Sequence, residues 1–149
     1  MIRAAELPGN PAGLEETRRA PVSTEWTVPF GPSYFHLGLH NLPPAEADSL
    51  IRELNRLMRD PSEARRNELL AAIAASPEAL VVLNHPLWDQ GGVGAEAHAA
   101  LLRRLLDSSG EFIHAIELNG LRPWEENQQV IGLAKDLGRT LVSGGDRHG

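Results

Sequence analysis

The sequence predicts an α/β fold, a sheet or a barrel in which most strands are parallel and helices flank them. Three observations lead to this prediction. Residues 79–83 are apolar throughout, as expected of a strand buried on both faces. From there onward, strand-like and helix-like segments alternate, which is the order of right-handed parallel crossovers. Polar residues follow each of these strands, at the ends where α/β proteins place their chemistry.

The composition indicates a single domain. The chain has 149 residues, 42% of them hydrophobic, which suffices for one core. It contains no cysteine, so a metal site would need histidine and carboxylate ligands. A net charge of −6 argues against a nucleic-acid surface. The sequence shows neither a membrane-spanning stretch nor a secretory signal, so we expect a cytoplasmic protein that does not bind membranes.

The first half of the chain predicts two strands between helices. Residues 12–19 suit a short helix. Residues 21–28 and 33–40 are rich in β-branched and aromatic side chains, which favours strands on either side of a turn. Leucines at helical spacing predict a long helix that has Pro44 near its first turn, and Ser62 begins another helix.

The second half of the chain carries the alternating pattern. After the strand at residues 79–83, we expect helices over residues 95–106 and 123–137, with strands over residues 112–118 and 139–142. The last strand runs into a glycine-rich turn that contains Asp146 and His148. Two residues apart on an extended segment, their side chains point the same way, and both are good ligands for a divalent metal.

Side chains that bind metals recur at the predicted strand ends. His85 and Asn84 follow one strand, Glu117 and Asn119 another, and Asp146 and His148 the last, while Glu25 and His36 lie on the early strands. Because the carboxyl ends of parallel strands converge, we expect these residues on one rim. Such a set of imidazoles and carboxylates suits zinc, manganese or iron.

Four motifs, in this order, resemble the PHP (polymerase and histidinol phosphatase) domain family. They are Glu25 with His36 eleven positions on, the sequence at residues 84–86, the sequence at residues 116–120, and the sequence at residues 145–149. The resemblance implies a partial distorted (β/α)7 barrel whose rim holds up to three metal ions and hydrolyses phosphoesters. Residues 1–149 would form one PHP-like domain segment that lacks the N-terminal and C-terminal parts of the family domain.

The resemblance also implies roles for individual residues. Glu25 matches a carboxylate that bridges two metals, and His36 and His85 match imidazole ligands of one of them. Asp146 matches a ligand of the other bridged metal, and His148 a ligand of the third. Glu117 and Asn119 match a feature of the pocket wall and are not counted as ligands.

The predicted substrate is a small phosphorylated molecule. Arg147 and Arg122 are candidate phosphate clamps, since a guanidinium grips phosphate bidentately, although Arg147 would point away from its neighbouring ligands. Trp88 lies close enough in sequence to His85 to line a pocket. We expect the other two tryptophans, Trp26 and Trp124, to serve packing.

Alternatives remain open at this level. The chain could be a non-catalytic PHP-like module that binds metal for structural or regulatory purposes, or a relative of the amidohydrolases. His40 could take the place of His36, because both have the same strand parity. We expect His114 to be a hydrogen-bonded core or helix-facing residue and not a ligand, and His98 to lie on the surface. An oligomer is also an open alternative, because a partial barrel would expose strand edges.

Overall fold

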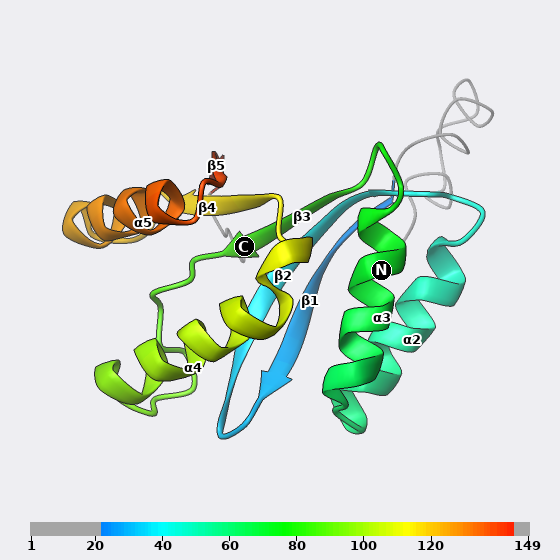
Figure 1. Cartoon of the computed structure of the whole chain (residues 1–149), viewed down its shortest axis with the longest axis horizontal. Helices are drawn as coiled ribbons and strands as arrows, with labels where there is room; N and C mark the ends of the chain where they lie inside the picture. The colour runs from blue at the N-terminus through cyan, green and yellow to red at the C-terminus, as the bar shows by residue number, and fades with distance from the viewer. Residues whose placement is uncertain (1–21, 145–149) are drawn as a thin grey trace, which may run out of the picture.

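A computed structural model describes residues 22–144 and shows an open, five-stranded mixed sheet with helices packed against it (Figure 1). The strands lie in the order in which they occur in the sequence. They are β1 (Val22–Phe30), β2 (Ser33–Leu42), β3 (Leu80–Asn84), β4 (Ala115–Asn119) and β5 (Thr140–Gly144). The helices are α2 (Ala47–Arg59), α3 (Glu63–Ala74), α4 (Ala95–Ser109) and α5 (Trp124–Asp136), with a short 3₁₀ turn, η2, at Gly110–Phe112.

The prediction of a partial distorted (β/α)7 barrel with mostly parallel strands is wrong. β1 pairs with β2 and β2 with β3 in antiparallel fashion, and only β3–β4 and β4–β5 are parallel. The five described strands form an open sheet and do not close on themselves. The physical reason is local, because only Gly31 and Pro32 separate β1 from β2, and so short a connection joins antiparallel strands. The alternation of strands and helices after residue 79 is confirmed.

One face of the sheet forms the hydrophobic core with the helices. Alternate residues of β1 to β3, including Trp26, Leu37 and Leu83, share one cluster with leucines of α2, α3 and α4. A smaller cluster joins Ile116 of β4 to Val130 and other residues of α5. Because successive side chains of a strand point to opposite faces, the residues of β1 and β2 that lie between these core positions face away from the helices.

The helix boundaries largely follow their capping signals. Ser62 caps α3, where its hydroxyl accepts a hydrogen bond from the Arg65 N–H at 3.4 Å. Helix α2 begins at Ala47, one turn later than the predicted start near Pro44. His98 is buried, which overturns the prediction that it lies on the surface. It belongs to the inward stripe of α4 because it precedes Leu101 and Leu102 by three and four residues.

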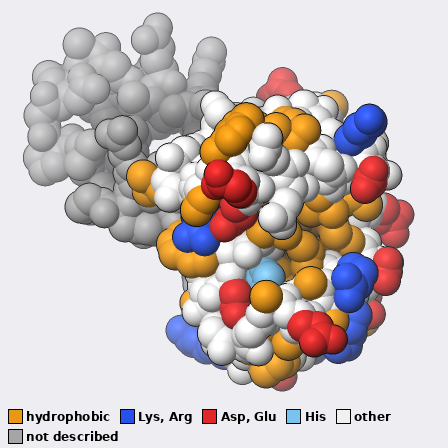
Figure 2. Space-filling view, turned by 90° about the vertical axis from the view of Figure 1, so that its left-hand side faces the viewer, with side chains coloured by type: hydrophobic (Ala, Val, Ile, Leu, Met, Phe, Trp, Pro, Cys, Tyr) orange, Lys and Arg blue, Asp and Glu red, His pale blue; other side chains and the backbone are white. Residues whose placement is uncertain are grey.

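The end of the molecule that carries α5 exposes hydrophobic side chains (Figures 1 and 2). The exposed large ones at this end are Leu121, Trp124 and Leu137. Trp124 is 61% exposed, so the expectation that it serves packing is not met. Trp26, at 2% exposure, does pack in the core. Among the described helices, none has the length and apolar character needed to cross a bilayer.

Candidate metal centre

Glu25, His36 and His85 come together from three neighbouring strands. Glu25 lies on β1 and His36 on β2, and His85 is the first residue after β3. In the sheet, Glu25 is opposite Gly38 and His36 is opposite Asn84. This register places Glu25 and His36 on the face of the sheet away from the helices, next to the end of β3. Antiparallel pairing, and not a rim of parallel strand ends, therefore assembles the group.

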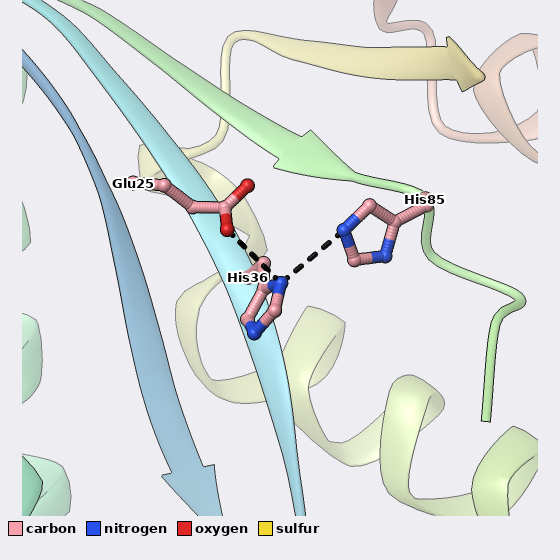
Figure 3. Close-up of side chains that lie close together, drawn as sticks. All are labelled: Glu25, His36 and His85. Atoms are coloured by element: carbon pink, nitrogen blue, oxygen red, sulfur yellow. Dashed lines mark hydrogen bonds and ion pairs between the residues drawn. The ribbon is translucent and has the colours of Figure 1, made fainter. Parts of the chain in front are cut away.

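The donor atoms of the three residues converge (Figure 3). His36 Nδ1 lies 3.2 Å from Glu25 Oε1 and 3.2 Å from His85 Nε2. One ligand atom from each residue lies within 4.8 Å of the other two. Two ligands on a tetrahedral zinc, with bonds of about 2.0–2.1 Å, would be about 3.3 Å apart. The two short separations match that spacing.

Hydrogen bonding alone satisfies this arrangement poorly. A neutral imidazole nitrogen carries either a proton or a lone pair, never both. With a proton, His36 Nδ1 must share it between Glu25 and His85; without one, it faces a carboxylate oxygen that is also an acceptor. A cation satisfies all three lone pairs at once, so the set of donors fits a divalent metal.

The exposure of the three residues to solvent decreases from Glu25 through His36 to His85. The side chain of Glu25 is 33% exposed and that of His36 is 12% exposed, whereas His85 is 5% exposed. A metal held here would have protein on one side and open access on the other. Catalytic metal sites have this form, with three protein ligands and a free position for water or substrate.

Neighbouring polar groups hold Glu25 in place. Asn84 Nδ2 donates a hydrogen bond of 2.7 Å to Glu25 Oε2, which leaves Oε1 directed at His36. Gly38 makes room for this contact, because a Cβ there would lie 3.0 Å from Asn84 Oδ1 and 2.8 Å from His40 Nε2. A larger residue opposite Glu25 would therefore displace the ends of the Asn84 and His40 side chains on this face.

A buried carboxylate fixes the backbone of His85. His85 has a φ of 29°, a backbone conformation that residues other than glycine rarely adopt. Its N–H donates a 2.9 Å hydrogen bond to Oε2 of Glu117, which is 7% exposed. The Glu117 side chain packs against Gly144 of β5 so closely that any Cβ at that position would overlap it. β4 and β5 thus help to orient an imidazole that follows β3.

Trp88 and Arg122 form a wall beside the group. The Trp88 ring meets the His85 ring edge-on, with centroids 5.2 Å apart, and the Arg122 guanidinium lies 4.8 Å from the Trp88 centroid. Glu126 accepts hydrogen bonds from Arg122 Nε and Nη2 at 2.8–3.1 Å. These hydrogen bonds raise the pKa of Arg122, so its charge is secure.

The loop after His85 is anchored to α4. Asp89 accepts hydrogen bonds from the N–H groups of Val93 and Gly94, and His98 Nε2 lies 2.9 Å from the Pro86 carbonyl oxygen. Partial burial raises the pKa of Asp89, but the hydrogen bonds from Gly94 and Val93, with the nearby His98, lower it by more. The pKa of Asp89 therefore falls below its ordinary value.

The structure brings together only part of the predicted ligand set. The predicted ligands Asp146 and His148, with Arg147, lie outside the described residues. His40, the alternative to His36, pairs with Leu80, four residues further along β2 from the group. His114 is a hydrogen-bonded residue as expected, since its Nδ1 accepts from the backbone N–H of Val81 at 3.0 Å.

The sequence analysis did not identify Tyr34 as a neighbour of the group. It also did not predict the hydrogen bonds by which Asn84 and Glu117 orient two of the candidate ligands. Tyr34 stacks on His36 with ring centroids 5.5 Å apart, which its position two residues earlier on the same strand could have indicated. The sequence analysis noted Asn84 and Glu117 as polar residues at strand ends and as parts of the PHP-like motifs, with Glu117 matched to the pocket wall, but it gave neither of them a hydrogen-bond partner. Their hydrogen bonds to Glu25 and to the His85 backbone depend on the pairing of strands, which the sequence pattern left undetermined.

Comparison with known proteins adds no assignment. The sequence matches no protein-family model, and it has no significant similarity to a curated protein. The likeness to the PHP family therefore depends on the four motifs alone, and the chemistry has to be argued from the site.

Proposed function

We propose that this protein is a metal-dependent hydrolase that acts on phosphoesters, with Glu25, His36 and His85 as ligands of a divalent metal. The observation that carries the proposal is the approach of three lone-pair donors to a common point. Zinc, manganese and iron all accept imidazole and carboxylate ligands. Asp146 and His148 are proposed to complete a site with more than one metal, up to the three that the PHP resemblance implies.

The chemistry requires a water activated at neutral pH. A divalent metal supplies it by lowering the pKa of a bound water towards about 7 and by polarising a phosphoryl oxygen. The protein's part is to fix the ligands. Asn84 orients the carboxylate of Glu25, and Glu117 holds the backbone of His85. The partly exposed side chain of Glu25 leaves a route for a substrate from solvent.

The neighbouring wall suits a phosphorylated substrate. Arg122 keeps its positive charge close to His85 through its contact with Trp88. Glu126 takes hydrogen bonds from Nε and Nη2 of Arg122, so a phosphate oxygen would meet the remaining nitrogen, Nη1. The flat face of Trp88 offers a surface for the organic part of a substrate.

The test compares metal content and hydrolysis in the full chain. We expect the wild type to bind zinc or manganese and to cleave p-nitrophenyl phosphate or its bis ester. His36→Ala and His85→Ala should lose metal, measured by mass spectrometry of the dialysed protein, and lose hydrolysis by more than about 100-fold. His114→Asn is the matched control, since it changes a histidine outside the group, and the amide oxygen of Asn can accept the Val81 N–H in place of Nδ1.

The two halves of the proposal fail in different ways. Unchanged metal stoichiometry in both His36→Ala and His85→Ala would overturn the ligand assignment. Metal binding that is lost in both variants, without hydrolysis of any phosphoester by the wild type, would leave a non-catalytic metal-binding module and overturn the enzyme assignment.

A further inference from the structure

A second candidate binding site lies on the opposite face of the sheet. A cavity of about 160 Å³ opens where the β1–β2 hairpin meets the end of α2 and the start of α3. Its lining includes Trp26, Phe30, Leu57, Glu63, Arg66 and Arg104. Trp26 and Phe30 belong to the core side of β1, whereas Glu25 faces the other way. The cavity is therefore separate from the candidate metal centre.

Two guanidinium groups, those of Arg66 and Arg104, line this cavity and contact the ring of Phe30, which lines it as well. The Cζ atoms of Arg66 and Arg104 lie 5.1 and 5.7 Å from the centroid of the Phe30 ring. Attraction to the ring face stabilises each cation, but it neutralises neither. The cavity thus gathers two positive charges over an aromatic surface.

The two arginines are only partly compensated. Arg66 is 6% exposed and donates hydrogen bonds to the hydroxyls of Ser108 and Ser109, which carry no charge. Its carboxylate partner, Glu63, lies 3.6 Å away with a side chain that is 63% exposed. Burial lowers the pKa of Arg66, and Glu63 raises it in part. Arg104 is exposed, so solvent screens its charge, and within the described part of the chain no carboxylate forms an ion pair with it.

Two further features favour an anion in this cavity. Ser62 and Glu63 at the start of α3 line it, and the N-terminus of a helix attracts negative charge, although the carboxylate of Glu63 already offsets part of that attraction here. The indole Nε1 of Trp26, a side chain that is 2% exposed, has no hydrogen-bond partner in the described part of the chain. A buried donor without a partner is costly, which adds to the local need for an acceptor.

Apart from the two arginines, Ser62 and Glu63, the side chains that line the cavity are apolar. Trp26, Val28 and Leu57 line the cavity together with the Phe30 ring. Its volume is close to that of an engineered apolar cavity of about 150 Å³ that takes up benzene. We propose that this cavity binds a small organic monocarboxylate with an aromatic or branched aliphatic body, and that its carboxylate is held by Arg66 and Arg104. This proposal does not depend on the proposed hydrolase function.

The experiment titrates the full chain with benzoate, without added metal, by calorimetry and by NMR of the indole N–H groups. The chain has three tryptophans, so each indole signal can be assigned by substitution to Phe. We expect benzoate to bind with a dissociation constant of about 1 mM or below and to move the Trp26 signal. Arg104→Gln should weaken binding at least about tenfold, while Arg103→Gln, an exposed arginine outside the cavity, should leave it unchanged.

Two controls make the outcome decisive. Benzamide has the same shape without the charge, and equal affinity for benzamide would overturn the role of the arginines. Inorganic phosphate tests whether any anion suffices, and tighter binding of phosphate than of benzoate would overturn the organic class of ligand. No saturable binding at about 10 mM benzoate, or a response confined to the Trp88 signal, would overturn the site itself.

Discussion

The two halves of the sheet differ in how they are joined and in what they contribute to the candidate metal centre. β1, β2 and β3 are antiparallel and supply Glu25, His36 and the approach to His85. β3, β4 and β5 are parallel and supply the buried carboxylate of Glu117. The antiparallel half carries the ligands and the parallel half fixes the backbone of one of them. A site on a hairpin is thereby anchored by strands that follow much later in the sequence.

The two halves also differ in the depth of their cores. In the antiparallel half, residues such as Leu37 and Leu39 belong to a large cluster with α2, α3 and α4. Among the described residues, Ile116, Val130 and Ala134 are the buried members of a separate cluster between the parallel half and α5. More of the hydrophobic stabilisation should therefore come from the half that carries the ligands.

The largest expected effect tests this difference in core depth. Leu37→Ala removes a fully buried side chain from the large cluster and should lower the free energy of unfolding by about 4–5 kcal/mol. Ile116→Ala, equally buried in the small cluster, should lower it by about 2–3 kcal/mol. Urea denaturation of both variants measures the difference.

Leu121→Ala is the control for the two core variants. Leu121 is 63% exposed, and its removal should change the free energy of unfolding by less than about 0.5 kcal/mol. An equal or larger loss in Ile116→Ala than in Leu37→Ala would contradict the uneven division of the core.

A smaller effect is expected where the parallel half supports the ligands. Glu117→Ala removes the acceptor for the His85 N–H and releases a residue with φ of 29°. Partners that orient a ligand without touching the metal typically contribute 10–100-fold to affinity, so we expect zinc binding to weaken by about that factor. Calorimetric titration with zinc measures it.

The matched control for Glu117→Ala is Glu125→Ala, which removes an exposed carboxylate from α5. It should leave zinc affinity unchanged while altering the net charge by the same amount. Zinc affinity that is unaltered in Glu117→Ala would show that the antiparallel half forms the site without help from β4.

The sequence predicted local segments well and the relations between strands less well. The strand at residues 79–83 and the helices after it were recognised because their apolar patterns are continuous or periodic. The prediction that most strands are parallel failed at Gly31 and Pro32, where a two-residue turn already requires an antiparallel pair. Hydrophobic pattern sets the period of a strand, but connection lengths set its direction.

For the candidate ligands too, the sequence indicated residues that lie together, but not the strand pairing that brings them together. Residue type and spacing singled out Glu25, His36 and His85, and these lie together, although the reason given for their convergence was a rim of parallel strands. Glu25 is the fourth residue of β1, not near its end, and it reaches the group through its register with β2. Pair register depends on contacts between distant segments, which one sequence does not contain.

The smallest expected effect concerns the loop that links His85 to α4. The hydrogen bonds from Val93 and Gly94 favour the charged form of Asp89 and lower its pKa from the ordinary 3.8. Since the folded protein prefers the carboxylate, this contribution to stability is complete above pH 3.8 and is lost as the pH falls through the lowered pKa.

Asp89→Asn tests this linkage, because the amide keeps one acceptor and cannot ionise. At pH 7 the variant should melt a few degrees below the wild type. The gap should narrow as the pH falls from about 4 through the lowered pKa of Asp89, because the unfolded wild-type chain takes up its proton first and the folded protein follows at lower pH. Melting curves by circular dichroism at pH 7, 4 and 3 measure the gap, and a gap that is constant over this range would refute the role given to the Asp89 charge. The hydrogen bonds of Asp89 hold the segment between His85 and α4. A constant gap would therefore mean that contacts with α4, such as the one between His98 and the Pro86 carbonyl, stabilise this segment, and that the charge of Asp89 does not.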